Sequence, residues 1–301
     1  MAKTAWIFPG QGSQSIGMGR DLADHPEARV QLQAADAILG WSVLEVCQRE
    51  DDAVSDTRYT QPCLYVIESI LADLLRRREA LGGSPDFVAG HSLGEYSALY
   101  VARVFDFESG LRLVKQRAEV MGQASSGGMA AIIGADRDQL DALLSQTEGV
   151  VMANDNSAAQ VVISGTQAAL DQVLSQVKAK RKLPLKVSGA FHSPLMAEAS
   201  QQFQTVLDKV AFQDAEVPVL SNTDPTPETA AIALKQRLSR QMTGSVRWRE
   251  TVLQLPNLEV DTVVEVGPGK VLTGLVKRTC SGIALQNVGG LSDLSDPSPS
   301  A

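Results

Sequence analysis

The chain has 301 residues, of which 44% are hydrophobic and 21% are charged, and its formal net charge is −8. This size and composition are typical of a soluble globular protein with one large domain or two modest ones. The acidic balance argues against nucleic-acid binding as the main task. No apolar stretch approaches the length of a membrane span, and the N-terminus lacks the layout of a signal peptide.

The cysteines indicate a reducing compartment. The chain has only Cys47, Cys63 and Cys280, which are scattered and odd in number. This pattern fits neither a disulfide framework nor a metal site, so we expect no metal. We expect a cytoplasmic protein, and a plastid stroma would leave the same composition.

The first third of the chain alternates between strand and helix patterns. Thr4–Phe8 predicts a strand, and the glycine-rich turn Pro9–Gln14 follows it. Thr60 and Pro62 predict the start of a helix, because a capping hydroxyl and a proline favour the first turn. A further helix is predicted from about Asp106 to Met121.

Between these two helices lies the sequence PDFVAGHSLG, residues 85–94, which contains the pattern G-x-S-x-G at Gly90, Ser92 and Gly94. An apolar strand precedes the pattern and a helix pattern follows it from Leu93. A serine at such a sharp turn stands exposed at a helix N-terminus, where the dipole and free N–H groups favour an oxyanion. The pattern therefore predicts a nucleophilic serine at position 92.

At residues 125–128 the composition changes to Ser-Ser-Gly-Gly, which is typical of a linker. The predicted elements that follow have the order strand, helix, strand, strand, helix, strand: Met129–Gly134, Arg137–Gln146, Val150–Ala153, Gln160–Ser164, Gln167–Val177 and Leu183–Val187. This order is the ferredoxin-like pattern. It indicates a small α+β unit inserted into a larger domain.

After Gly189 the chain returns to the larger domain. The predicted elements there are a helix near Met196–Val210, a strand at Val217–Ser221, helices around Pro227–Gln241 and Trp248–Leu255, and a strand at Thr262–Val266. We therefore expect an α/β fold, with a hydrolase-like parallel-sheet core from residues 1–125 and 192–290. Residues 126–191 form the inserted ferredoxin-like subdomain, and the tail 291–301, rich in Ser, Pro and Asp, is expected to be disordered.

A serine nucleophile needs a base, and the chain has only three histidines. His91 directly precedes Ser92 and is expected to point away from its hydroxyl, and His25 lies in a polar turn at the surface. Counting leaves His192 as the base candidate. The alternative is a core histidine with ordinary hydrogen-bond partners, but the presence of Ser92 favours the catalytic interpretation.

Three further residues are candidates for the site. A loop after the first strand can supply a backbone N–H to an oxyanion, so we assign Gln11 this role and the N–H of Leu93 the second. Arg117 lies 25 residues after the serine. It is either a solvated helix charge paired with Glu119 or Asp106, which the residues alone favour, or a buried fork for a substrate carboxylate.

The run Lys178-Ala179-Lys180-Arg181-Lys182, with Lys186, is basic against an acidic background. Such a run is often simply a solvated face. Because it lies close in sequence to His192, it could also attract an acidic carrier protein or the phosphates of coenzyme A. Both interpretations remain open at this point.

Seven segments, in order and spanning about residues 4–290, closely resemble the family of malonyl-CoA:acyl-carrier-protein transacylases. These are the stand-alone acyltransferases of bacterial-type (type II) fatty acid synthesis. The matching segments are Phe8–Gln14, Thr60–Pro62, Gly90–Glu95, Gln116–Met121, Ala190–Met196, Val246–Trp248 and Glu265–Leu272.

The resemblance implies a ping-pong transfer from malonyl-CoA to the pantetheine thiol of holo acyl carrier protein, with no cofactor beyond the groups that the substrates carry. Ser92, activated by His192, would form the malonyl ester, and the N–H groups of Gln11 and Leu93 would bind the oxyanion. The resemblance also implies that Arg117 binds the malonyl carboxylate and so acts as a clamp for it. Such a clamp would reject acetyl groups, since the buried charge would then stay unpaired.

The resemblance assigns four secondary roles. The backbone carbonyl of Gln241 would orient His192, in place of an acidic third member. The ring of Phe191 would crowd a 2-methyl branch and disfavour methylmalonyl-CoA. Gln61 and Met121 are further pocket candidates, and we expect a monomer.

Three other functions stay open on the sequence. A trans-acting loader for a polyketide synthase would share the chemistry. A serine thioesterase or esterase would need an acid between serine and histidine, and the aspartates available by order are Asp138, Asp141, Asp155 and Asp171. A carrier-protein binder without activity is the third, although the intact Ser92 and His192 argue against it.

Overall fold

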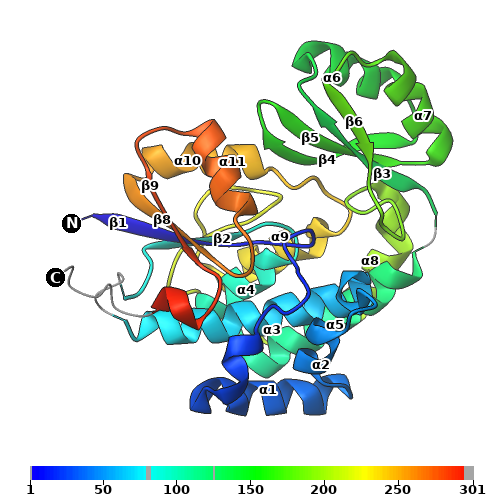
Figure 1. Ribbon diagram of the computed structural model, residues 1–301. Coiled ribbons are helices and arrows are strands. Elements are labelled where there is room, and N and C mark those ends of the chain that lie inside the picture. Colours follow the sequence, from blue (N-terminus) through cyan, green and yellow to red (C-terminus); the bar gives the residue numbers. More distant parts are fainter. Residues whose placement is uncertain (1, 79–82, 125, 295–301) are drawn as a thin grey trace.

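The computed structural model describes residues 2–78, 83–124 and 126–294, which form two sheets with helices packed around them (Figure 1). The larger sheet has five parallel strands in the order β7-β2-β1-β8-β9. Their bounds are β1 Lys3–Phe8, β2 Phe87–Gly90, β7 Val219–Leu220, β8 Val260–Val266 and β9 Ala284–Val288.

Side chains of β1 alternate between two hydrophobic cores. Ala5 and Ile7 pack in the core that includes residues of α10 and α11, whereas Trp6 and Phe8 pack in the core on the opposite face with α3. All four are almost completely buried. A parallel strand covered on both faces reads as a continuous apolar run, as this one does.

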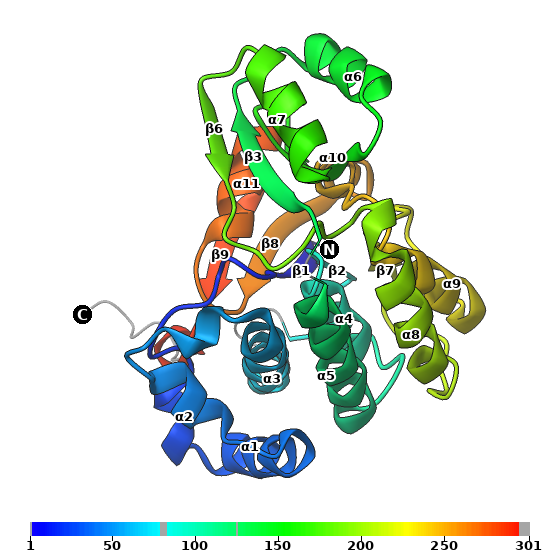
Figure 2. The ribbon, with the colours of Figure 1, turned by 90° about the vertical axis from the view of Figure 1, so that its right-hand side faces the viewer.

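Helices cover both faces of the large sheet (Figures 1 and 2). The elements on the α3 side include α3, α4 and α5, with α1 and α2 outside them, and α10 and α11 lie on the other side. The helix bounds are α1 Pro26–Leu39, α2 Val43–Gln48, α3 Thr57–Arg76, α4 Gly94–Val101, α5 Phe107–Gln123, α8 Ala197–Leu207, α9 Ala231–Gln241, α10 Trp248–Asn257 and α11 Val271–Thr279. Short 3₁₀ helices are Arg20–Asp24, Ala53–Ser55, Pro194–Met196 and Leu291–Leu294.

Residues 128–184 form the small subdomain, which confirms the predicted ferredoxin-like order. Its elements are β3 Gly128–Ile133, α6 Arg137–Gln146, β4 Val150–Ser157, β5 Gln160–Gly165, α7 Gln167–Gln176 and β6 Arg181–Pro184. The antiparallel strands have the order β4-β5-β3-β6. One face of this sheet packs on α6 and α7, while Met129, Ala131 and Val162 on the other face join the core of the larger domain.

Several predicted boundaries were wrong. The helix expected to start at Thr60 starts at Thr57, because Asp56 caps it by accepting a hydrogen bond from the N–H of Arg58. Pro62 therefore lies in the second turn. The last strand of the small subdomain is Arg181–Pro184 rather than Leu183–Val187, since pairing with β3 decides its limits.

The prediction of a disordered tail over residues 291–301 was also partly wrong. Leu291–Leu294 form a 3₁₀ helix with Leu294 buried, and the N–H of Leu291 donates to Asp21 near the other end of the chain. The rest of the predicted tail, residues 295–301, lies outside the described residues. Four elements were not predicted: the helices α1, α2 and α11 and the edge strand β9. None of the helices in the described ranges is long and apolar enough to cross a bilayer.

Candidate active site

Ser92 lies on a sharp turn between β2 and α4. Its φ is 53°, in the left-handed region that L residues seldom adopt. Glycines make the turn possible: a Cβ on Gly90 would lie 1.9 Å from the backbone of Gly94, and one on Gly94 would lie 2.0 Å from the carbonyl oxygen of Phe8. The turn therefore needs the two glycines of the G-x-S-x-G pattern.

A second segment of the chain holds this turn in place. Asn222, which follows β7, donates from Nδ2 to the carbonyl oxygen of Gly90 at 2.5 Å and accepts the N–H of Ser92 at 2.7 Å. Its own backbone N–H donates to the carboxylate of Glu95. Asn222 is almost completely buried, so it replaces water as the hydrogen-bond partner of the strained backbone.

His192 lies against the serine hydroxyl. Its Nε2 is 2.8 Å from Ser92 Oγ, and its Nδ1 is 2.9 Å from the carbonyl oxygen of Gln241 and 3.2 Å from that of Gly244. Carbonyls only accept, so Nδ1 carries the proton and Nε2 is free to accept the serine proton. The pattern of donors thus fixes the tautomer that a general base requires.

Burial keeps His192 neutral. It is 4% exposed, and burial, followed by the positive charge of Arg117, lowers its pKa to about 3. His91 takes a separate environment: its Nε2 bonds Asn156 at 2.8 Å and its ring meets Trp248 edge-on. His91 thus bonds away from the serine hydroxyl, as predicted. The third histidine, His25, is half-buried next to α1 rather than fully at the surface.

Arg117, on α5, points its guanidinium to the serine. Nη2 donates to Ser92 Oγ at 3.0 Å and to the side-chain oxygen of Gln241 at 3.1 Å, and Nη1 donates to that of Gln61 at 2.6 Å. The guanidinium also lies over the ring of Tyr96, 5.4 Å from its centre. These partners are all neutral.

The charge of Arg117 is both buried and unpaired. The residue is 1% exposed, and within the described residues it makes no ion pair, neither with Glu119 nor with Asp106. Its Nε is buried without a hydrogen-bond partner. The carboxylate of Glu95 interacts with this charge only at a distance, with Gln241 bonded to both residues. A buried charge with no ion-pair partner in contact is costly, so this geometry is suited to an anionic ligand. The alternative of a solvated helix charge does not fit the structure.

The two predicted oxyanion donors line the same cavity. Gln11 follows β1 and Leu93 follows the serine, and both contact a cavity of about 90 Å³. Among the described residues, no acceptor is hydrogen-bonded to the N–H of either one. The cavity is lined by Gln11, His91, Ser92, Leu93, Arg117, Met121, Met129, Asn154, Val162, Leu185, Val187, Phe191 and His192.

A second cavity, of about 260 Å³, borders the first. The two share Gln11, His91, Asn154, Val162 and Leu185, and the second extends between the loop 9–13 and α11. Leu185 and Val271 on its walls are 37% and 48% exposed. The pair of cavities therefore forms a mainly apolar passage from the surface to Ser92.

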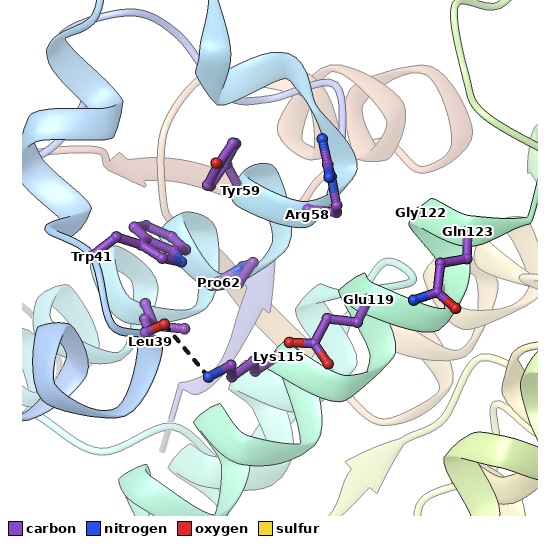
Figure 3. Close-up of a pocket in the computed structure, with 9 residues that line it drawn as sticks. All are labelled: Leu39, Trp41, Arg58, Tyr59, Pro62, Lys115, Glu119, Gly122 and Gln123. Carbon is purple, nitrogen blue, oxygen red and sulfur yellow. Dashed lines mark hydrogen bonds between the residues drawn. The ribbon is translucent and has the colours of Figure 1, made fainter.

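A cavity of about 440 Å³ lies elsewhere, between α3, α5 and the loop after α1 (Figure 3). Trp41, Tyr59 and Pro62 form its apolar part, and Lys115 is bonded to the carbonyl oxygen of Leu39. It shares no lining residue with the cavity at Ser92. Size alone would select the wrong site, because no serine, cysteine or histidine lines this larger cavity.

The structure brings the predicted site residues together. Gln61 and Gln241 both accept from Arg117, Met121 lies 3.5 Å from Gln61 Nε2, and Phe191 is a wall of the small cavity. Sequence reasoning missed Asn222, Asn154 and Thr57. Of these, only Asn222 had a signal, namely a polar residue directly after a predicted strand on the same sheet edge as Ser92.

The aspartates proposed for a hydrolase do not contact His192. Asp141 and Asp155 pair with Arg137 in the small subdomain, and Asp171 accepts from Gln167 on α7. Within the described residues, the partners of His192 Nδ1 are two backbone carbonyls. The arrangement therefore lacks the acid–histidine pair of a hydrolase triad.

Comparison with known proteins places the chain in a family. The sequence pattern of the acyl transferase domain matches residues 5–291. The chain belongs to the acyl transferase family. The parallel-sheet core with its inserted antiparallel subdomain, the fold predicted from the sequence, is the fold of this family's solved members.

Individual relatives resemble this acyl transferase over nearly its whole length. The malonyl CoA-acyl carrier protein transacylase of Synechocystis is 58% identical, with 97% of this chain and 99% of that protein covered, and its crystal structure has a TM-score of 0.94. The polyketide biosynthesis malonyl CoA-acyl carrier protein transacylase of Bacillus subtilis is 40% identical, over 91% of this chain and 96% of that protein. A malonyl-transacylase solved with its holo type II polyketide acyl-carrier protein is 35% identical, with a TM-score of 0.90 and coverage of 97% of this chain and 98% of that one.

Proposed function

We propose that this acyl transferase moves a malonyl group from malonyl-CoA to the phosphopantetheine thiol of holo acyl carrier protein, through a malonyl ester on Ser92. One observation carries the proposal: an unpaired, buried guanidinium lies 3.0 Å from a serine hydroxyl that is itself 2.8 Å from a neutral histidine. The nucleophile and its base perform acyl transfer, and the guanidinium selects an acyl group that bears a carboxylate.

In the first half-reaction, Ser92 Oγ attacks the thioester carbonyl as His192 Nε2 takes the hydroxyl proton. The negative charge that develops on the carbonyl oxygen is bound by the N–H groups of Gln11 and Leu93. The C–S bond then breaks, and the CoA thiolate leaves with the proton from His192. The products are the malonyl ester of Ser92 and free CoA, and His192 is neutral again.

The second half-reaction reverses these roles with a different thiol. His192 takes the proton of the phosphopantetheine thiol, and the thiolate attacks the ester carbonyl. The oxyanion forms in the same place, the C–O bond to Ser92 breaks, and His192 returns the proton to Oγ. Each step is a proton or acyl transfer that these side chains perform, so we propose that no cofactor takes part beyond the substrate-borne groups.

The malonyl carboxylate would accept a hydrogen bond from an N–H of Arg117 that, without substrate, donates to a neutral oxygen. Both N–H groups of Nη2 are already used, by Ser92 Oγ and by Gln241. A carboxylate on Nη1 and Nη2 would form charge-assisted bonds and release the serine hydroxyl from the guanidinium. In our proposal Phe191, a wall of the same cavity, limits substitution at the 2-position of the acyl group.

We propose that the enzyme supplies malonyl groups to fatty acid synthesis. We also propose that it acts in the cytoplasm and as a monomer. The 58% identity to the Synechocystis transacylase supports this choice over a polyketide loader. The 40% identity to the Bacillus subtilis polyketide transacylase keeps the loader as the second candidate. Transfer rates to fatty-acid and polyketide carrier proteins from the same genome decide between the two.

The experiment that tests the proposal is intact-protein mass spectrometry. Malonyl-CoA alone should add the mass of one malonyl group to the wild type and none to Ser92→Ala. Holo acyl carrier protein should then remove the adduct and gain the same mass. Release of the adduct mainly to water would support a hydrolase instead, and the absence of any adduct on the wild type would overturn the proposal.

The choice of malonyl is tested with Arg117→Ala. Loss of the clamp should lower kcat/KM for malonyl transfer by about 100-fold or more, because the carboxylate would be buried without its partner. Acetyl transfer, which never used the clamp, should fall far less. Equal losses for both acyl groups would show that Arg117 does not recognise the carboxylate.

A further inference from the structure

The first turn of α3 holds a buried hydroxyl that joins two parts of the site. Thr57 Oγ1 lies 2.7 Å from Gln11 Oε1 and 3.1 Å from Gln61 Nε2, and Thr57 is 6% exposed. Gln61 Oε1 in turn lies 2.6 Å from Arg117 Nη1. A continuous chain of hydrogen bonds therefore runs from Arg117 to the loop after β1.

The charge of Arg117 fixes the direction of the first two bonds in this chain, and the orientation of the Gln11 amide sets the third. A guanidinium only donates, so Gln61 must present its amide oxygen to Arg117. The amide nitrogen of Gln61 then donates to Thr57 Oγ1, and the threonine hydroxyl is left to donate to Gln11 Oε1. If the Gln61 amide were reversed, its NH₂ group would face the guanidinium, donor against donor.

Thr57 also fixes Gln11 in space. Among the described residues, the side chain of Gln11 has no hydrogen-bond partner except Thr57. Other side-chain bonds of this loop stay within it: Ser13 donates to the carbonyl oxygen of Gly10, and Gln14 accepts the N–H of Gly12. The bond to Thr57 therefore ties the loop to α3 and, through Gln61, to Arg117.

We propose that Thr57 is a positioning residue that holds the oxyanion loop, residues 9–14, in place relative to Arg117. The inference rests on the proposed function, in which the N–H of Gln11 binds the oxyanion. An oxyanion donor works only when it is preorganised where charge develops. Arg117 keeps its bond to Gln241 without Thr57, so ground-state binding of the carboxylate should hardly depend on the threonine.

Thr57→Val tests the proposal, because it removes the hydroxyl and keeps the methyl group that faces Gly122 on α5. The expected result is a fall in kcat of about five- to tenfold, as for the loss of one hydrogen bond, with KM for malonyl-CoA nearly unchanged. Rates are divided by the active sites titrated as malonyl-Ser92. Thr57→Ser retains the hydroxyl and should restore most of kcat.

Thr60 provides a matched control on the same helix. It is completely buried, and its hydroxyl donates to the carbonyl oxygens of Val54 and Asp56, away from the site. Thr60→Val should lower the melting temperature as Thr57→Val does, but it should leave kcat per titrated site unchanged. This comparison separates positioning from general stability.

Given an active wild type, either of two results would overturn the positioning role alone. The first is that Thr57→Val has the same kcat as the wild type. The second is that Thr57→Val and Thr60→Val lose kcat equally. A wild type that forms no malonyl-Ser92 would overturn the proposed function and the role of Thr57 together. The titration of the wild type therefore tells the two failures apart.

Discussion

Both members of the candidate catalytic pair have strained backbones. Ser92 has φ 53° and His192 has φ 57°, conformations that cost non-glycine residues about 1 kcal/mol or more each. Asn222 compensates at Ser92, and the carbonyls of Gln241 and Gly244 hold the imidazole of His192. Strain at both residues indicates that the surrounding structure, and not local preference, sets the 2.8 Å contact between them.

The lowered pKa of His192 predicts an unusual pH dependence. The base must be neutral, and its pKa of about 3 lies below the ordinary value of 6.5 because of burial and the charge of Arg117. The single-turnover rate of malonyl-Ser92 formation should therefore stay constant as the pH falls through 6.5 and decline only in more acidic solution. A decline with its midpoint near 6.5 would contradict this expectation.

The same shift predicts that acid weakens the fold. The unfolded chain protonates this histidine below a pH of about 6.5, whereas the folded protein keeps it neutral down to its lowered pKa. The free energy of unfolding should therefore fall as the pH drops from about 6.5 toward 3. Urea unfolding of the wild type and of His192→Gln should show a smaller pH dependence for the variant.

At the scale of elements, the site depends on how closely α4 approaches β1. Gly94 is the first residue of α4, and a Cβ there would lie 2.0 Å from the carbonyl oxygen of Phe8, at the end of β1. That oxygen accepts the N–H of His91 at 2.9 Å, so it cannot move away without losing a bond. The second glycine of the pattern is thus a packing requirement between a helix and a central strand.

Gly94→Ala should therefore destabilise the protein by about 3 kcal/mol, the upper end of the range for overpacking a core. The measurement is urea unfolding. Gly128→Ala is the matched control, because its Cβ would meet no atom closer than 3.6 Å and its φ is not in the left-handed region. If the two variants unfolded at the same urea concentration, the close approach of α4 to β1 would be shown to tolerate a methyl group.

At the scale of the whole molecule, the small subdomain carries a run of exposed cations despite the net charge of −8. Arg181 and Lys182 lie on the edge strand β6, and Lys186 follows it, next to the passage residue Leu185. Within the described residues, none of the three cations makes an ion pair. Unpaired cations beside the entrance favour an anionic partner over a merely solvated face.

Charge reversal tests this interpretation. The double variant Arg181→Glu with Lys186→Glu should raise KM for acyl carrier protein about tenfold, with kcat unchanged, and the difference should shrink at high ionic strength. Lys209→Glu, exposed after α8, is the control. A parallel rise in KM for malonyl-CoA would assign the run to the CoA phosphates, and no change in either would leave a solvated face.

The sequence alone determined the features that depend on local patterns. The order of most strands and helices followed from apolar periodicity, although α1, α2, α11 and β9 were missed. Ser92 followed from glycine spacing at a strand-to-helix turn. His192 followed from the scarcity of histidines, and the family motifs supplied roles for Gln11, Leu93, Arg117 and Gln241. These features can be predicted from the sequence because each depends on a few consecutive residues or on a simple count.

Only the tertiary structure decided what depends on segments far apart in the chain. The residues alone favoured a solvated Arg117, and only the packing of α5 against the turn at Ser92 removes water from this side chain and leaves it without an ion pair. Asn222 contacts the turn at Ser92 across 130 positions, and Thr57 contacts the oxyanion loop across 46 positions. No local pattern predicts either contact, although Asn222 directly follows a predicted strand. The limits of α3 and β6 likewise follow from a cap and from strand pairing, because these contacts outweigh local preference.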